Sequence, residues 1–164
     1  MSSGYKVACN WLLEQRGKLE GGEASNPKKW NEFWNLIWGL NCPSKVKQFM
    51  WRACKNTLPT NYSLKLKRIP MEDACGVCGK VKSSGHALWD CEVAEAVWKE
   101  SKLTLPKFRS PLRDFLDVVR KIWEDRRDIS WETFATTAWC IWKNRNATKF
   151  EGRNKARKMV AREA

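Results

Sequence analysis

The chain has 164 residues, 43% of them apolar, and its 31 Lys and Arg against 18 Asp and Glu give a formal net charge of +13. This length suits about one domain, and such a charge attracts polyanions, either nucleic acid or an anionic membrane surface. No stretch approaches the roughly 18 apolar residues that span a bilayer, and no basic start with an apolar run marks a secretory signal. Seven cysteines, an odd number, argue against a disulfide framework. We therefore expect an intracellular protein of the nucleus or cytoplasm.

Helix signals dominate the first part of the chain. Residues 1–29 are predicted to hold a short helix and a Gly-rich polar linker. The next helix is predicted from apolar residues at helical spacing, which are Trp30, Phe33, Trp34, Ile37 and Trp38. Ser44 is the predicted N-cap of a second helix, and Thr60 is that of a short third one.

Helical signals also dominate the second half. Apolar spacing returns over 93–98. Ser110 and Pro111 predict the N-cap and first residue of the following helix. Ser130 is the predicted start of the last helix and Gly152 its predicted C-cap.

Between Ile69 and this second half, apolar periodicity disappears and a Cys and His pattern takes its place. The pattern is C-x2-C-x7-H-x4-C, and its members are Cys75, Cys78, His86 and Cys91. Two cysteines separated by two residues form a tight turn that aims both sulfurs at one point, and Gly79 suits its left-handed backbone. Three thiolates and one imidazole are a closed ligand set, typical of one structural Zn²⁺ without an open position for catalysis. Four unconnected core residues and a redox-active CxxC are the alternatives; the latter needs a strand–helix context that is not apparent.

The remaining cysteines and most tryptophans are predicted to be core residues. The cysteines beside apolar helical positions are expected to be buried thiols: Cys9, Cys42, Cys54 and Cys140. The tryptophans on apolar helical faces are Trp34, Trp38, Trp98, Trp123 and Trp142. The predicted fold class is therefore mainly α, a small helical domain with a zinc-organised loop that allows a short β-hairpin at the metal site.

Further motifs accompany the ligand set. They are Trp34-x3-Trp38, Pro43-Ser44-Lys45-Val46-Lys47, Phe49, Trp51-Arg52, Leu58-Pro59-Thr60, Leu64, Arg68-Ile69 and, after Cys91, Ala94 with Val97-Trp98. Together they resemble the reverse-transcriptase zinc-binding domain of plant LINE-type (non-LTR) retrotransposon polyproteins, over about residues 30–100. The flanks are similar to the same polyproteins, through Ser3-Gly4-Tyr5-Lys6 and through Trp139-x2-Trp142-Lys143-x-Arg145-Asn146 with Phe150. One departure is Ser83-Ser84-Gly85, where that family commonly has an acidic residue before the histidine.

The resemblance implies a retroelement-derived module with its own boundaries. Residues 30–101 form the zinc-binding-like domain, 102–151 a helical pair packing on or following it, and 152–164 a basic tail. No enzymatic activity is expected, because the chain contains no Asp-Asp polymerase motif, no convincing RNase H carboxylate set and a single histidine that the metal uses.

Nucleic acid is the expected partner. Between Cys42 and Pro70 no acidic residue occurs and seven basic ones do: Lys45, Lys47, Arg52, Lys55, Lys65, Lys67 and Arg68. With Trp51 and Tyr62 interleaved, this surface is predicted to bind RNA or DNA without sequence specificity, although a merely solvated face with Trp51 in the core is the alternative. Other readings are a scaffold that docks polymerase or RNase H-like domains in trans, or a decayed fragment without activity; a membrane partner is not expected.

Overall fold

The computed structural model describes residues 27–70, 72–125 and 128–152. The helix expected near the N-terminus and the basic tail beyond Gly152 lie outside these residues. The chain divides into two compact units, one ending at Leu36 and the other beginning at Ile37. Helix α2 (Pro27–Gly39) contains this division, and its first part carries a ring cluster in which Phe33 meets Trp30 and Trp34 edge-on, at centroid distances of 5.6 and 5.0 Å.

The second unit is helical. After α2 it contains α3 (Ser44–Cys54), α4 (Asn61–Leu66), a π-helical turn η1 (His86–Asp90), α5 (Glu92–Glu100), α6 (Phe115–Glu124) and α7 (Trp131–Glu151). In the described residues no strand occurs, and the expected hairpin is reduced to one antiparallel bridge between Ala74 and Val81. The mainly α fold class is thus confirmed. None of the described helices has the length and apolarity needed to cross a membrane.

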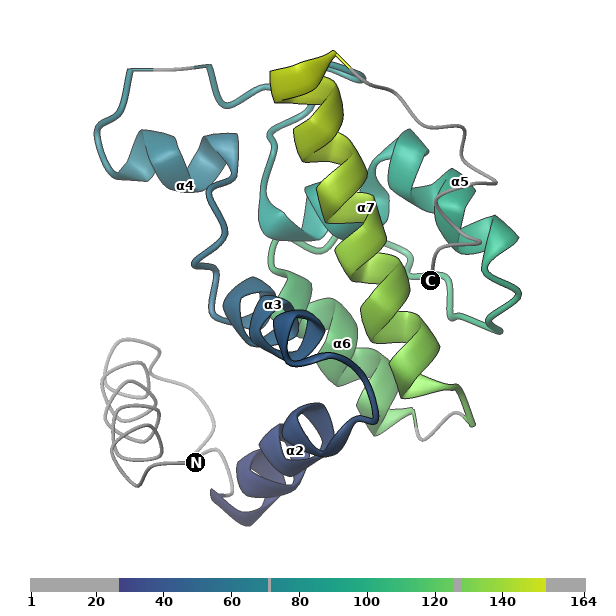
Figure 1. Ribbon diagram of the computed structural model, residues 1–164. Helices are drawn as coiled ribbons and strands as arrows, with labels where there is room; N and C mark the ends of the chain where they lie inside the picture. The colour runs from purple at the N-terminus through teal and green to yellow at the C-terminus, as the bar shows by residue number, and fades with distance from the viewer. Residues whose placement is uncertain (1–26, 71, 126–127, 153–164) are drawn as a thin grey trace. The chain divides into compact units, whose positions relative to one another are not determined.

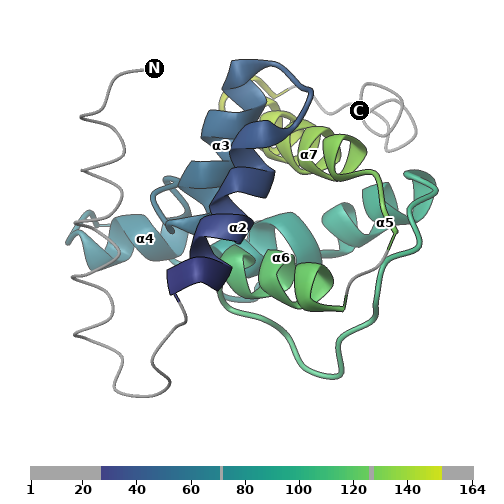
Figure 2. The same cartoon turned by 90° about the horizontal axis from the view of Figure 1, so that it is seen from below.

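Helix α7 is the central element of the second unit. It packs against α3, α5 and η1, while α6 packs against α3 and η1, so α7 lies between α3 and α5 (Figures 1 and 2). Helices α3, α5, α6 and α7 bury apolar side chains at helical spacing: Val46, Phe49, Met50, Val97, Trp98, Phe115, Val118, Val119, Ile122, Phe134, Ala138 and Ile141. An aromatic stack, Trp98 on Phe134 at 4.9 Å, joins α5 to α7.

Most predicted helix ends are confirmed. Thr60 and Ser130 are N-caps whose side chains accept hydrogen bonds from Ser63 N and Thr133 N, and Gly152 ends α7 with a left-handed φ of 63°. The prediction for Ser44 is wrong by one residue. The carbonyl of Pro43 already accepts the amide of Val46 at 2.9 Å, so Pro43 occupies the N-cap and Ser44 begins the helix.

The predicted start of α6 at Ser110 and Pro111 is also wrong, because the helix begins at Phe115. The backbone before α6 hydrogen-bonds to the segment that contains the Cys and His pattern instead of to its own neighbours. Leu112 N donates to Asp90 Oδ2 at 3.0 Å, and the carbonyl of Arg113 accepts Gly85 N at 2.9 Å. The beginning of α6 is therefore fixed by a tertiary contact.

Core assignments of the tryptophans and cysteines hold in part. Trp98 and Trp142 are buried, and the Trp98 indole donates to Leu88 O at 2.8 Å. The large indole is seldom buried completely, and the other three predicted core tryptophans are only half-buried: Trp34, Trp38 and Trp123. Among the cysteines outside the Cys and His pattern, Cys54 and Cys140 are buried, Cys42 is half-buried and Cys9 lies outside the described residues.

Candidate metal centre

The first two candidate ligands lie on a tight turn between Ala74 and Val81. Cys75 N donates to Lys80 O at 2.7 Å, and Gly79 N donates to Cys75 O at 2.8 Å. Gly79 has a φ of 71°, which confirms the predicted left-handed position. Backbone amides of Val77 and Cys78 hydrogen-bond to the Cys75 sulfur. The turn thus exposes amide donors to a thiolate while it aims both cysteines toward the same side.

The other two candidate ligands lie at the two ends of η1. On an α-helix, positions five residues apart point in directions that differ by about 140°. Here the amide of Cys91 donates to the carbonyl of His86 at 2.9 Å, a bond between residues i and i+5 that widens the turn. The wide turn brings both side chains to one side. Sequence reasoning missed this helical turn because the segment lacks apolar periodicity. The H-x4-C spacing was the sequence signal that could have identified it.

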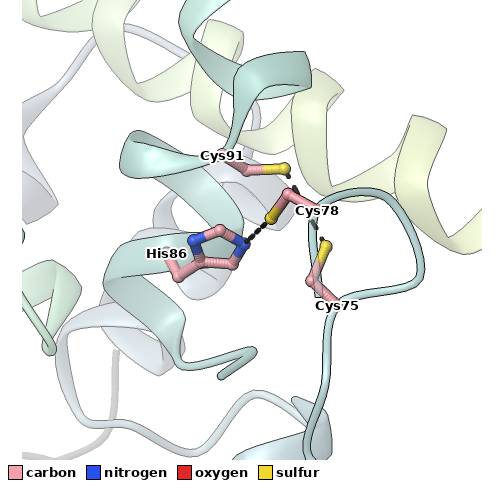
Figure 3. Close-up of side chains that lie close together, drawn as sticks. All are labelled: Cys75, Cys78, His86 and Cys91. Atoms are coloured by element: carbon pink, nitrogen blue, oxygen red, sulfur yellow. Dashed lines mark hydrogen bonds between the residues drawn. The ribbon is translucent and has the colours of Figure 1, made fainter. Parts of the chain in front are cut away.

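The four candidate ligands converge on one point (Figure 3). Their donor atoms all lie within 4.8 Å of one another. Cys75 Sγ is 3.9 Å from Cys91 Sγ, and Cys78 Sγ is 3.3 Å from His86 Nε2. With Zn–S bonds of about 2.3 Å, neighbouring corners of a tetrahedron lie about 3.8 Å apart, so the donor set and its spacing fit Zn²⁺. The alternative of four unconnected core residues is wrong.

Burial and hydrogen bonding act in opposite directions on the three thiols. Burial raises the pKa of Cys75, but hydrogen bonds from the amides of Val77 and Cys78 and from His86 and Arg145 bring that pKa down to about 7. The pKa of Cys91 is likewise lowered, against burial, mainly by Arg145. Burial leaves the pKa of Cys78 raised. The site therefore favours the thiolate form, which binds metal, at the two sulfurs next to Arg145.

Arg145 is the residue that sequence reasoning missed at this site. It is 8% exposed, and its Nη2 donates to Cys75 Sγ at 3.2 Å. Its position continues the apolar stripe of α7 after Ala138 and Ile141, at spacings of seven and four residues. A cation on a buried stripe was the signal that could have identified it.

The seven residues predicted to bind nucleic acid are distributed over α3, α4 and the residues that follow each helix. Five are exposed and two half-buried; the exposed ones are Lys45, Arg52, Lys65, Lys67 and Arg68. The half-buried pair is Lys47 and Lys55. The ammonium group of Lys47 donates a hydrogen bond to Trp38 O at 3.0 Å. Among the exposed ones, Lys65 forms an ion pair with Asp73 at 2.9 Å.

The aromatic residues interleaved with these cations are only partly exposed. Trp51 is half-buried, and so is Tyr62, whose ring lies under the Arg113 guanidinium at 5.6 Å. A third ring, Trp139 of α7, is also half-buried and lies beside the basic surface. The ammonium groups of Lys45 and Lys143 are 4.8 and 4.5 Å from its centroid.

A Cys3His cluster held by a tight turn and a helical turn, in a small helical unit, has the arrangement of a zinc-binding module. Residues 19–98 match the family described as zinc-binding in reverse transcriptase. The resemblance inferred from the sequence is thereby confirmed.

One relative extends beyond the family match. An Arabidopsis thaliana protein, whose name describes it provisionally as a ribonuclease H protein, is 28% identical over 174 residues. The alignment covers 96% of this chain but only 28% of the relative. The chain therefore spans less than a third of the length of that relative. No solved structure matches the chain.

Proposed function

We propose that the chain is a non-catalytic module of a plant LINE-type retroelement polyprotein that binds one structural Zn²⁺ and contacts RNA or DNA through its basic surface. The family of residues 19–98 and the relative named for ribonuclease H support the retroelement origin. Three cysteines and a histidine supply four ligands, and such closed sets hold structural zinc. The bound ion would cross-link the Cys75 turn to η1.

The zinc assignment is tested by elemental analysis of the purified chain. We expect one zinc per chain, and none in His86→Ala or Cys91→Ser. Structural zinc contributes about 10–16 kcal/mol in small metal-dependent modules, more than most domains have in total stability, so both variants should also lose helicity over about residues 70–100. Cys42→Ser, a thiol outside the cluster, is the control and should keep its zinc. Full metal content and an unchanged melting temperature in His86→Ala would remove the assignment.

The nucleic-acid assignment is carried by one observation, the five exposed cations among seven basic residues in a stretch without any acidic one, between Cys42 and Pro70. Phosphates bind such surfaces by releasing counterions, without reading sequence. Beside this surface, Trp139 with Lys45 and Lys143 combines an aromatic ring with cations, the combination that holds unpaired bases in single-stranded complexes.

A salt series with a fluorescent single-stranded oligonucleotide tests this part. The affinity should fall steeply with salt, and the double variant Lys45→Gln/Arg52→Gln should lower the slope by about two. The matched control is Lys99→Gln/Lys107→Gln, which removes two exposed cations elsewhere and should leave the slope nearly unchanged. Trp139→Ala should weaken binding by about 1–3 kcal/mol with little change in slope. No binding at low salt, or equal slopes for both double variants, would contradict the proposal.

Protein docking is the second candidate function, favoured by one feature. The large apolar side chains that are exposed in the described residues, Leu66, Ile69, Val77 and Val81, all fall within a 16-residue stretch that contains the Cys75 turn. Exposed apolar side chains that gather in one region often mark protein contacts. If docking is the function, Leu66→Ser/Val81→Ser should abolish concentration-dependent association in sedimentation, or binding of a polymerase or RNase H-like domain, while nucleic-acid binding persists.

A further inference from the structure

The guanidinium of Arg145 is nearly enclosed by protein, yet it lies 3.2 Å from a cysteine sulfur. Burying an isolated cation costs several kcal/mol, and Arg is seldom buried without a partner. Its Nη2 donates to the Cys75 sulfur, and the Cys91 sulfur lies 3.9 Å from that sulfur. Its other two nitrogens, Nε and Nη1, have no hydrogen-bond partner. The two sulfurs are therefore the groups that balance this charge.

Neutral thiols would balance the positive charge of the Arg145 guanidinium poorly. A dication bound by three thiolates and one neutral imidazole carries one net negative charge, which a single guanidinium cancels. Hydrogen bonds that involve an ionised donor or acceptor are roughly twice as strong as neutral ones. The burial of Arg145 thus fits the metal-bound form of the ligand set much better than the metal-free, protonated form.

We propose that Arg145 is an outer-sphere positioning residue of the zinc site, and that its contact with Cys75 and Cys91 makes metal binding and packing of the C-terminal half of α7 one coupled event. Cys75 and Arg145 are 70 residues apart in the chain. Arg145 also lies well outside the matched residues 19–98. The part of the structure that supports zinc binding accordingly extends into α7. This inference rests on the structural zinc of the proposed function.

Zinc affinity, measured by competition with a chromophoric chelator, tests the inference directly. Arg145→Gln should weaken zinc binding about 10–100-fold, the usual effect of losing an outer-shell partner. Arg145→Lys should lose less zinc affinity, because lysine keeps the positive charge. It should still lose some, because lysine lacks the planar guanidinium that can reach two sulfurs. Lys99→Gln on α5, an exposed residue, removes the same charge and should bind zinc as the wild type does. Equal zinc affinity of Arg145→Gln and wild type would overturn the inference.

A second readout separates contact with sulfur from general destabilisation. With Co²⁺ in place of Zn²⁺, the thiolate-to-metal charge-transfer band reports hydrogen bonds at sulfur. We expect the band to move to longer wavelength in Arg145→Gln, to move less in Arg145→Lys, and to stay in place in Lys99→Gln. If Arg145→Gln does not fold, the comparison of Arg145→Lys with wild type decides, and an unchanged band with unchanged zinc affinity would overturn the inference.

Hydrogen exchange of the wild-type chain tests the coupling itself. Chelation of zinc should release amide protection over about residues 141–148 together with that of 75–91, and retained protection of α7 would overturn the coupling. A wild-type chain that binds no zinc would overturn the proposed function and this inference together. A chain that binds zinc with the same affinity with and without the Arg145 side chain would overturn the inference alone.

Discussion

Gly85 is the tightest point next to the metal ligands. A Cβ on this residue would overlap the backbone oxygen of Leu112 and lie 2.8 Å from that of Arg113. Both atoms belong to the backbone that fixes the start of α6, so neither can move without disturbing that helix. Any side chain here would therefore force the segment of the metal ligands and the start of α6 apart.

We expect Gly85→Ala to lower the free energy of unfolding by at least about 2 kcal/mol, because overpacking against backbone cannot be relieved by a rotamer change. Gly76→Ala is the matched control in the same segment, since a Cβ added there would meet no atom within 4 Å; its effect should stay within about 0.5 kcal/mol. Urea unfolding followed by tryptophan fluorescence measures both. Similar midpoints for the two variants would contradict the close approach at Gly85.

At this scale the sequence was most informative where the chemistry is local. The four candidate ligands and the left-handed Gly79 could be predicted, because their pattern depends on a turn of a few residues. Arg145 and the close contact of Gly85 could not be predicted, because each depends on which distant segment packs against the ligands. The partial burial of Trp34, Trp38 and Trp123 was missed for a related reason: helical spacing identifies a face but not how completely that face is covered.

At the scale of elements, the existence of the described α-helices could be predicted, whereas the π-helical turn η1 and two helix starts could not. Thr60 and Ser130 act as caps because their side chains bond to amides three residues ahead. Ser110 has an equally good local signal but does not cap α6. The amide that begins α6, Phe115 N, donates instead to Ser84 Oγ at 3.1 Å, and Ser84 also donates to Asn56 Oδ1. A hydroxyl 31 residues away thus replaces the local cap.

Two serine variants distinguish these caps. Ser84→Ala should cost about 1–3 kcal/mol, because it leaves the buried amide of Phe115 and the half-buried side-chain oxygen of Asn56 without their hydrogen bond. Ser110→Ala should change the stability by less than about 0.5 kcal/mol, whereas loss of a true N-cap costs about 1 kcal/mol. Thermal unfolding of both full-length variants gives the comparison. A larger loss for Ser110→Ala than for Ser84→Ala would restore the predicted start of α6.

At the scale of the whole molecule, the second unit is held together by helices outside the family match. Helices α6 and α7 follow residue 98, where that match ends, yet they supply Phe115, Val118, Ile122, Phe134 and Ile141, each at most 1% exposed. Full burial of such a side chain contributes roughly 1.5–3 kcal/mol. Five of them together match the stability of a typical domain, about 5–15 kcal/mol.

A chain shortened to residues 1–101 should therefore show no cooperative unfolding, even with zinc present, whereas residues 1–152 should unfold in one transition. Far-UV circular dichroism in increasing urea compares the two. The same midpoint for both chains would mean that α6 and α7 are accessory to a self-sufficient zinc domain.

The π-helical turn between His86 and Cys91 restricts where this segment can change in length. Adding or removing one residue between these two ligands would turn one of them away from the other and break the i to i+5 hydrogen bond. Between Cys78 and His86 the backbone passes through the exposed Lys80 and Val81, which belong to no helix, so an extra residue there would disturb only the hydrogen bonds of a short turn. Natural length variation should thus accumulate before the histidine and be absent after it.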